Sequence, residues 1–137
     1  MRVMGLDIGT KRIGVAVSDE TGTLAQGRGI VTRESDNQAI DQIKSIIEEY
    51  KVGEIVAGLP LNMDGTKGER ARDCEEFSGR LEKETGLPVK LWDERLSTKE
   101  VESVLIAADV SRDKRKKVTD KLAAQIILQN YLDSLGK

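Results

Sequence analysis

Histidine is absent from the 137 residues of this chain, and its absence excludes several kinds of active site. A Ser-His-Asp triad, a Cys-His pair, a zinc ion held by histidine and a histidine general base are all impossible without it. Any chemistry must therefore come from carboxylates, lysines, hydroxyl groups or a bound ion.

Cysteine is scarce as well, because Cys74 is the one cysteine in the chain. One thiol forms no intramolecular disulfide and no thiolate zinc site, which favours the reducing cytoplasm. No apolar run approaches the roughly 20 residues of a membrane span. The first acid, Asp7, comes too early for the apolar stretch of a signal peptide. We therefore expect a soluble, cytoplasmic protein with no membrane partner.

Aromatic residues are also few, with one tryptophan, two tyrosines and one phenylalanine. Stacking on bases would therefore contribute little to nucleic-acid binding, and recognition of backbone or shape is favoured over recognition of bases. The 22 basic and 24 acidic residues give a net charge of −2. Such a balance neither indicates nor excludes a polyanionic partner, so the local charge has to decide.

The hydrophobic pattern predicts an α/β fold that begins with strands. Apolar runs at 2–8, 13–17 and 29–32, joined by turns that contain glycine, indicate three antiparallel strands. The rest of the pattern predicts a helix at 40–50, a buried parallel strand at 55–58, a helix at 71–81 capped by Gly86, a strand at 89–92, a helix at 97–108 and a last helix at 120–135. We expect one domain over residues 1–137.

Asp7 is the first candidate for chemistry, since it interrupts the apolar first strand on the same face as Gly5 and Gly9. An ionised carboxylate in such a place needs a cation or hydrogen-bond donors. It is either a metal ligand with room for a substrate phosphate, or a turn acid that accepts hydrogen bonds from the loop amides. The strand pattern by itself leaves both interpretations open.

Two further acidic positions follow later elements. Asp93 and Glu94 come at the end of the last expected strand, where open α/β sheets bind ligands. Only one of them can share the face of the site, and the other interpretation is an ion pair with Arg95 or a helix cap. Asp120 opens the last expected helix, where the positive helix end also explains an acid. If Asp7, Glu94 and Asp120 converge, they need divalent cations.

Such a cluster suits two Mg²⁺ or Mn²⁺ ions roughly 4 Å apart, acting in an in-line attack on a phosphodiester. Basic residues follow the first acid or precede the last one, where they would hold a phosphate backbone or form a solvated loop. These residues are Lys11, Arg12, Arg112, Lys114, Arg115, Lys116 and Lys117.

Four segments together resemble one bacterial family. They are GLDIGTKRIGVAVSD at 5–19, IVAGLPLNMDG at 55–65, WDERLST at 92–98 and DKLAAQIILQNYL at 120–132. In this order they are similar to the YqgF-type, or RuvX-like, proteins, which are relatives of the RuvC resolvases. The resemblance implies the ribonuclease H-like fold, with a central five-stranded mixed sheet flanked by about four helices.

The resemblance also implies a metal-dependent nuclease. Its substrate would be the 5′ end of the 16S rRNA precursor, which brings ribosome precursor particles in as partners, or a DNA junction. The motifs assign Asp7, Glu94 and Asp120 as catalytic acids and metal ligands, with Asp93 as the alternative to Glu94. Monomer and homodimer both stay open.

The chain departs from the RuvC resolvases in one respect, and two other functional classes are alternatives. RuvC resolvases place two acids near the last helix, whereas Ala123 and Ala124 stand near Asp120 here, so resolvase activity does not transfer directly. The Asp-Ile-Gly-Thr segment also resembles the first phosphate-binding hairpin of sugar kinases and actin-like ATPases, but those proteins clamp ATP between two such domains. A non-catalytic RNA-binding assembly factor would need no carboxylates. A titration with Mg²⁺ or Mn²⁺ separates these classes.

Overall fold

The computed structural model describes residues 1–93 and 112–135, with the backbone alone for 112–121. Its elements are β1 (Arg2–Ile8), β2 (Arg12–Ser18), β3 (Ala25–Thr32), α1 (Asp36–Tyr50), β4 (Val52–Leu59), α2 (Glu69–Thr85), β5 (Val89–Asp93) and α4 (Arg112–Ser134). The helix expected at 97–108 lies outside the described residues. None of the helices within the described ranges is long and apolar enough to cross a membrane.

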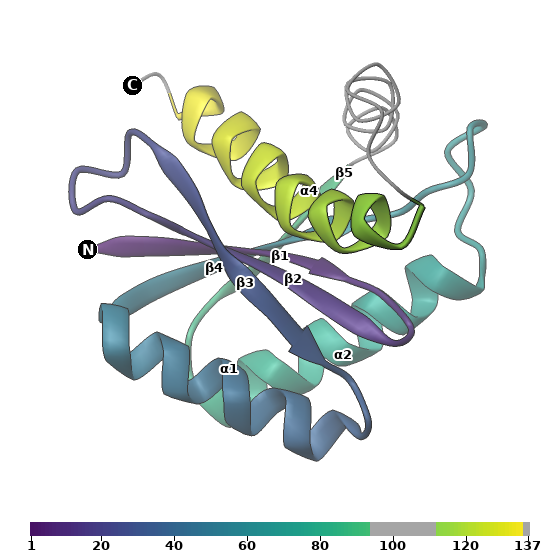
Figure 1. Cartoon of the computed structure of the whole chain (residues 1–137), viewed down its shortest axis with the longest axis horizontal. Helices are drawn as coiled ribbons and strands as arrows, with labels where there is room; N and C mark the ends of the chain where they lie inside the picture. Colours follow the sequence, from purple (N-terminus) through teal and green to yellow (C-terminus); the bar gives the residue numbers. More distant parts are fainter. Residues whose placement is uncertain (94–111, 136–137) are drawn as a thin grey trace.

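The five strands form one mixed sheet in the order β3-β2-β1-β4-β5. The first three strands pair in antiparallel fashion, and β4 and β5 extend the sheet in parallel with β1. Figure 1 shows α1 and α2 on one face of the sheet and α4 across the other. The prediction of three antiparallel strands followed by parallel ones is confirmed.

Local signals explain where α1 and α2 begin and end. The Ser35 side chain accepts a hydrogen bond from the Gln38 amide and caps the start of α1. Lys51 ends α1 in the left-handed region, with φ of 56°, and Gly86 ends α2 in the same way, with φ of 73°. Glycine adopts this conformation without strain, which explains why it was a reliable stop signal in the sequence.

The start of α4 differs from the sequence prediction. The helix begins at Arg112, so the basic run at 112–117 forms its first turns and is not a loop. Lysine and arginine are good helix formers, and neither glycine nor proline interrupts the run. Asp120 consequently lies eight residues inside the helix. The interpretation of Asp120 as an acid at a helix start is wrong, because the charge of a helix end acts only over its first turn.

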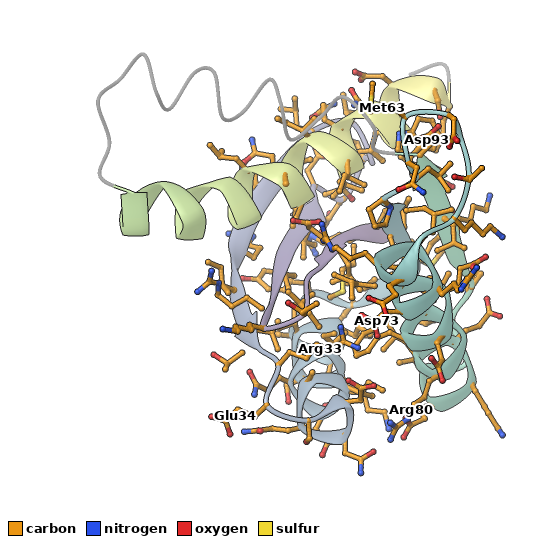
Figure 2. The ribbon with its side chains drawn as sticks, turned by 90° about the vertical axis from the view of Figure 1, so that its right-hand side faces the viewer. Arg33, Glu34, Met63, Asp73, Arg80 and Asp93 are labelled. Atoms are coloured by element: carbon orange, nitrogen blue, oxygen red, sulfur yellow. The ribbon has the colours of Figure 1, made fainter. Side chains whose placement is uncertain are left out.

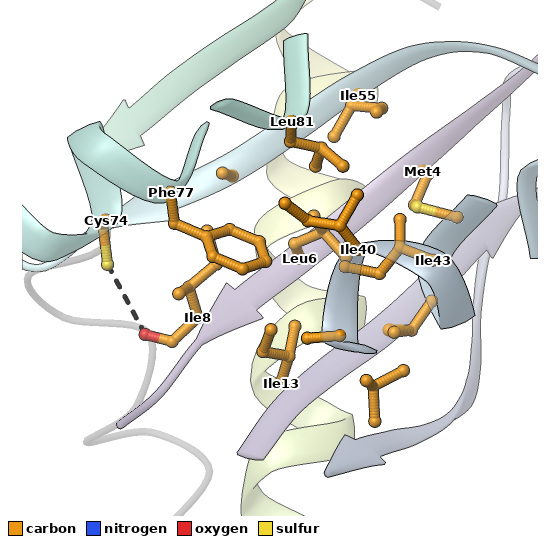
Figure 3. Close-up of a cluster of buried hydrophobic side chains, with 14 of the residues drawn as sticks. Met4, Leu6, Ile8, Ile13, Ile40, Ile43, Ile55, Cys74, Phe77 and Leu81 are labelled. Atoms are coloured by element: carbon orange, nitrogen blue, oxygen red, sulfur yellow. Dashed lines mark hydrogen bonds between the residues drawn. The ribbon is translucent and has the colours of Figure 1, made fainter. Parts of the chain in front are cut away.

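The larger apolar core lies between the sheet and the helices α1 and α2 (Figure 3). Strand alternation supplies one layer and the helical spacing of α1 and α2 supplies the other. The Cys74 thiol, at the rim of this core, donates a hydrogen bond of 3.5 Å to the carbonyl oxygen of Ile8. The largest fully buried side chains of this cluster are Phe77, Met4, Leu6, Ile8, Ile13, Ile40, Ile43, Ile55 and Leu81.

A second core lies between the other face of the sheet and α4. A Cβ atom at Gly5 would stand 2.6 Å from the Leu128 Cβ atom and 3.0 Å from the Ala124 carbonyl oxygen, so α4 lies directly against the backbone of β1. The other members of this cluster are Val3, Ala16, Ala25, Val56, Ile127, Tyr131 and Leu132, with Trp92 packed at its margin.

Two glutamines of α4 fix its direction and cover the edge strand β3. The Gln129 Oε1 atom accepts from the Ala25 amide at 2.9 Å, and the Gln125 Oε1 atom accepts from the Gly27 amide at 3.2 Å. The residue numbers rise from 25 to 27 along β3, while those of the contacting residues of α4 fall from 129 to 125. The helix α4 therefore runs opposite to β3. Because β3 and β1 run the same way, α4 runs opposite to β1. Donors of a sheet edge are thereby satisfied within the chain.

Candidate functional site

Asp7 is the second-to-last residue of β1 and lies on the face of the sheet that α4 covers. This face follows from alternation, because Val3 packs under α4 and Gly5 contacts Leu128. The carboxyl ends of the parallel strands β1, β4 and β5 meet at one edge of the sheet, which is where such sheets bind ligands. Asp7 is partly buried at this edge.

Glycines surround Asp7 on both neighbouring strands. Asp7 pairs with Gly14 of β2. On the other side, Leu6 pairs with Ala57 of β4. The next residue of each strand follows the same register, which places Gly58 beside Asp7. Only Gly5 and Gly9, which precede and follow Asp7 in the chain, were identified from the sequence. The strand register adds Gly14 and Gly58. Because glycine has no side chain, neither of these paired positions fills the space beside the carboxylate.

Asp93 does not share the face of Asp7. Trp92, the residue before it, packs edge-on against Tyr131 of α4 with ring centroids 5.8 Å apart. Alternation then turns Asp93 to the opposite side of β5, where it is exposed. Figure 2 looks at this edge of the sheet and shows Asp93 near Met63 of the loop that follows β4. Because Glu94 lies outside the described residues, the choice between Asp93 and Glu94 as ligand stays a prediction.

The backbone of α4 brings Asp120 level with Asp7. Ala124 lies against Gly5, and α4 runs opposite to β1. Two residues forward along β1 cover about 6.6 Å, and four residues back along α4 cover about 6 Å, so both steps arrive at the same height. Asp120 also shares a helix face with Ala124 and Leu128, both of which are buried against the sheet.

The donor chemistry at this edge fits a hard divalent cation. Asp7 offers carboxylate oxygens, and the chain has no histidine to compete as a ligand. Among the side chains that the structure describes, no three acids, cysteines or histidines gather closely enough to hold a metal ion. Neither Glu94 nor the Asp120 side chain belongs to that set, so convergence of all three acids stays a prediction.

Basic residues stand at the same edge as Asp7. Lys11 is exposed in the turn between β1 and β2, directly after the strand that carries Asp7, and Arg12 is the partly buried first residue of β2. The backbone of 112–117 forms the start of α4, which lies at this end of β1 in Figure 1. Lys11 and Arg12 thus adjoin the candidate site, whereas the first turns of α4 extend outward from the body of the molecule in Figure 2, so a role of 112–117 at the site stays a prediction.

The sequence reasoning missed Arg33, which the structure places beneath the turn that follows Asp7. Its guanidinium donates to both carboxylate oxygens of Asp73 at 2.6 and 2.9 Å and to Asp36 at 2.9 Å. Figure 2 shows Arg33 and Asp73 side by side between α1 and α2. The hydrogen bonds from Arg33 lower the pKa of the Asp73 carboxyl, and Asp73 in turn raises the pKa of Arg33. No motif signalled this pair, because 40 residues separate its members.

Solved structures with this arrangement show which fold the chain adopts. The Thermus thermophilus RuvC protein in complex with a Holliday junction substrate superposes with a TM-score of 0.55 at 16% identity, over 99% of this chain and 96% of that one. The Fowlpox virus resolvase with Holliday junction DNA gives a TM-score of 0.58 at 17% identity, over 100% of both chains. The fold is therefore that of the RuvC-like resolvases, a ribonuclease H-like nuclease fold.

Sequence comparison narrows the class to a family. The sequence model of the RuvX family, described as Holliday junction resolvase, matches residues 1–134. A protein of Halothermothrix orenii is 53% identical over 137 residues, covering 100% of this chain and 98% of that protein. One of Geobacillus thermodenitrificans is 55% identical over 136 residues, covering 98% and 99%. Both are named "Putative pre-16S rRNA nuclease".

The chain belongs to the RuvX family. This membership confirms the resemblance read from the four motifs and decides against the two-domain ATPases. A nuclease family of this kind implies a requirement for a divalent metal ion in general. It does not by itself say which residues of this chain bind the ion.

Proposed function

We propose that this chain is a cytoplasmic nuclease that hydrolyses phosphodiester bonds and processes the 5′ end of the 16S rRNA precursor. The observation that carries the proposal is the place of Asp7. Its carboxylate lies at the carboxyl edge of three parallel strands, between glycines of both neighbouring strands. The names of relatives that share about half of their residues along the whole chain support the RNA substrate.

Asp7, Glu94 and Asp120 are the residues proposed to hold Mg²⁺ or Mn²⁺. Two such ions, when bound, would supply an activated water and would neutralise the leaving 3′ oxygen. The chain itself contributes position and charge. The pairing of β1 on both sides fixes the backbone of Asp7. The absence of side chains at Gly14 and Gly58 lets a phosphate approach, and the basic residues offset the repulsion between the acids and the phosphate.

The first prediction separates the two acids after β5. We expect Glu94→Gln to reduce cleavage by about 100-fold or more and Asp93→Asn to change it less than about threefold. The reason is that Asp93 faces away from Asp7, whereas the motif resemblance assigns Glu94 as the ligand. Initial cleavage rates of the two purified variants measure this. Equal losses, or a larger loss for Asp93→Asn, would contradict the proposed ligand.

The second prediction concerns the basic start of α4. Replacing Arg115, Lys116 and Lys117 by alanine should weaken binding to many RNA sequences alike, because each lost phosphate contact releases one counterion fewer. The slope of log affinity against log salt should fall in magnitude by up to about two to three units. Alanine keeps the helix, so circular dichroism should not change.

A matched control for this variant removes basic charge elsewhere. Arg80 and Lys83 are exposed in the second half of α2, and Figure 2 shows Arg80 far from the edge that carries Asp93. Alanine at both positions should leave the salt slope unchanged. If the triple variant binds with wild-type affinity and slope, the basic run is only a solvated helix surface.

The proposed function is tested by comparing two substrates under the same conditions. The wild-type protein is incubated with an RNA that carries the 5′ leader of 16S rRNA and with a four-way DNA junction, in Mg²⁺, in Mn²⁺ and in a chelator. We expect metal-dependent cleavage of the RNA at one boundary. Binding without cleavage in either metal would instead support a non-catalytic assembly factor.

Cleavage of the DNA junction is the second candidate function, and the family description favours it. Two buried alanines, Ala123 and Ala124, weigh against it. They follow Asp120 by three and four residues, so that α4 offers no second acid on the adjoining turn of the face that contacts the sheet. Symmetric cutting of the junction faster than cleavage of the RNA would make this candidate the better one.

A further inference from the structure

The peptide groups that follow Asp7 are held from the face of the sheet opposite to α4. The Ile8 carbonyl accepts from the Cys74 thiol at 3.5 Å. The Gly9 carbonyl accepts from the Arg33 guanidinium at 2.9 Å. The Arg33 amide also donates to the Lys11 carbonyl at 2.8 Å. Arg33 thus contacts the turn between β1 and β2 at two places, within four residues of Asp7.

This turn is tight and tolerates little change. The Gly9 amide donates to the Arg12 carbonyl at 2.9 Å. A Cβ atom at Gly9 would stand 2.6 Å from the same carbonyl oxygen, a distance that real Cβ atoms do not reach. The turn joins Asp7 to the basic residues Lys11 and Arg12. A shift of this turn would therefore move the proposed metal ligand and the proposed phosphate contacts together.

The Arg33 side chain is itself held on all sides. Four of its five N–H donors are used, by Gly9, Asp36 and twice by Asp73. Its guanidinium lies 4.9 Å over the centroid of the Phe77 ring. Only 8% of the side chain is exposed. Such a planar fork is rigid, so a group that it contacts is held at a fixed place.

We propose that Arg33 is a positioning residue of the nuclease site. By binding the Gly9 carbonyl while Asp73 and Asp36 hold its guanidinium, Arg33 fixes the end of β1 and orients the Asp7 carboxylate for a divalent cation. The inference rests on the proposed function. It extends the site to side chains of the β3–α1 loop, α1 and α2 that lie on the other face of the sheet. Groups that orient a metal ligand typically change metal affinity or activity by about 10- to 100-fold when they are removed.

The test compares Arg33→Lys with the same change at Arg2. Lysine keeps the positive charge but cannot reach the three acceptors at once. Arg2 is a matched control at the other end of β1, because it too donates to a backbone carbonyl, that of Tyr50 at 3.3 Å, and lies 3.7 Å from a carboxylate, that of Glu20. Asp73→Asn is a milder second variant, which loosens Arg33 from its partner and leaves its bond to Gly9 possible.

Two readouts distinguish positioning from general stabilisation. Hydrogen exchange at the Gly9 amide should become at least about tenfold faster in Arg33→Lys, because the turn opens locally. Calorimetric binding of Mn²⁺ to the folded protein should weaken by about 10- to 100-fold, with a smaller change for Asp73→Asn. Cleavage should need correspondingly more metal and recover when the metal concentration is raised. Arg2→Lys should match wild type in all three measurements.

The outcomes separate this inference from the function on which it rests. The inference is overturned if Arg33→Lys has a lower melting temperature but wild-type affinity for Mn²⁺, because Arg33 then only stabilises the fold. If Arg33→Lys does not fold, the same comparison is made with Asp73→Asn. If wild-type protein binds no Mn²⁺ and cleaves neither substrate, the proposed function fails and the inference fails with it. The measurements on the wild-type protein are enough to show a failure of the proposed function.

Discussion

Asp7→Asn is expected to remove metal-dependent cleavage and to leave the fold in place. The amide has nearly the shape of the carboxylate but is a poorer ligand for a hard cation. Groups that merely orient a ligand change activity by about 10- to 100-fold, so loss of a ligand itself should exceed about 100-fold. The measurement is the initial rate of RNA cleavage in Mg²⁺ and in Mn²⁺, with the melting temperature of each preparation.

The matched control for this variant is Asp19→Asn. Asp19 follows β2, at the opposite edge of the sheet, where its carboxylate accepts hydrogen bonds from the Thr23 and Leu24 amides. These hydrogen bonds lower the pKa of Asp19, and an asparagine can accept them through its carbonyl oxygen. We expect cleavage to change less than about threefold in this control. A folded Asp7→Asn protein that cleaves at the wild-type rate would remove Asp7 from the site.

Gly5→Ala is expected to destabilise the protein and to impair cleavage beyond what the lost stability explains. The new Cβ atom would meet the Leu128 Cβ and the Ala124 carbonyl, so the backbones of β1 and α4 must move apart. Overpacking of this kind costs about 1–3 kcal/mol. The same movement would separate Asp120 from Asp7, because Asp7 lies two residues after Gly5 on β1 and Asp120 lies four residues before Ala124 on α4. Urea unfolding and cleavage rates well below the unfolding transition measure the two effects.

Gly79→Ala provides the comparison for this variant. Gly79 is exposed in the interior of α2, and a Cβ atom there meets nothing within 4 Å. Alanine should therefore raise the free energy of unfolding by about 0.5–1 kcal/mol through its helix propensity, with no effect on cleavage. If Gly5→Ala were as stable and as active as Gly79→Ala, then α4 would not rest on β1 as the structure has it.

The order and type of the elements within the described residues were accessible from the sequence because local patterns set them. The continuous apolar run of β4 indicated a buried parallel strand, and Gly86 marked the end of α2. The start of α4 was not accessible in the same way. The expectation followed the apolar stripe, which begins only where α4 meets the sheet, whereas the first turns of α4 are basic. A helix without an apolar face shows no periodicity to detect.

The sequence by itself determined the kinds of residue that could act. Without histidine and with one cysteine, it left carboxylates, lysines, hydroxyl groups or a bound ion, and it singled out Asp7 in an apolar strand. These conclusions need only residue identity and the two-residue period of a strand. The four motifs added the family, which the comparisons confirm.

Only the tertiary structure decided which groups lie together. Strand register brought Gly14 and Gly58 beside Asp7, and the packing of Trp92 under α4 turned Asp93 away from it. The contact between Gly5 and α4 set Asp120 level with Asp7. Register, the face of a strand end and the height of a helix over a sheet depend on contacts between residues far apart in the chain, and a local pattern does not contain those contacts.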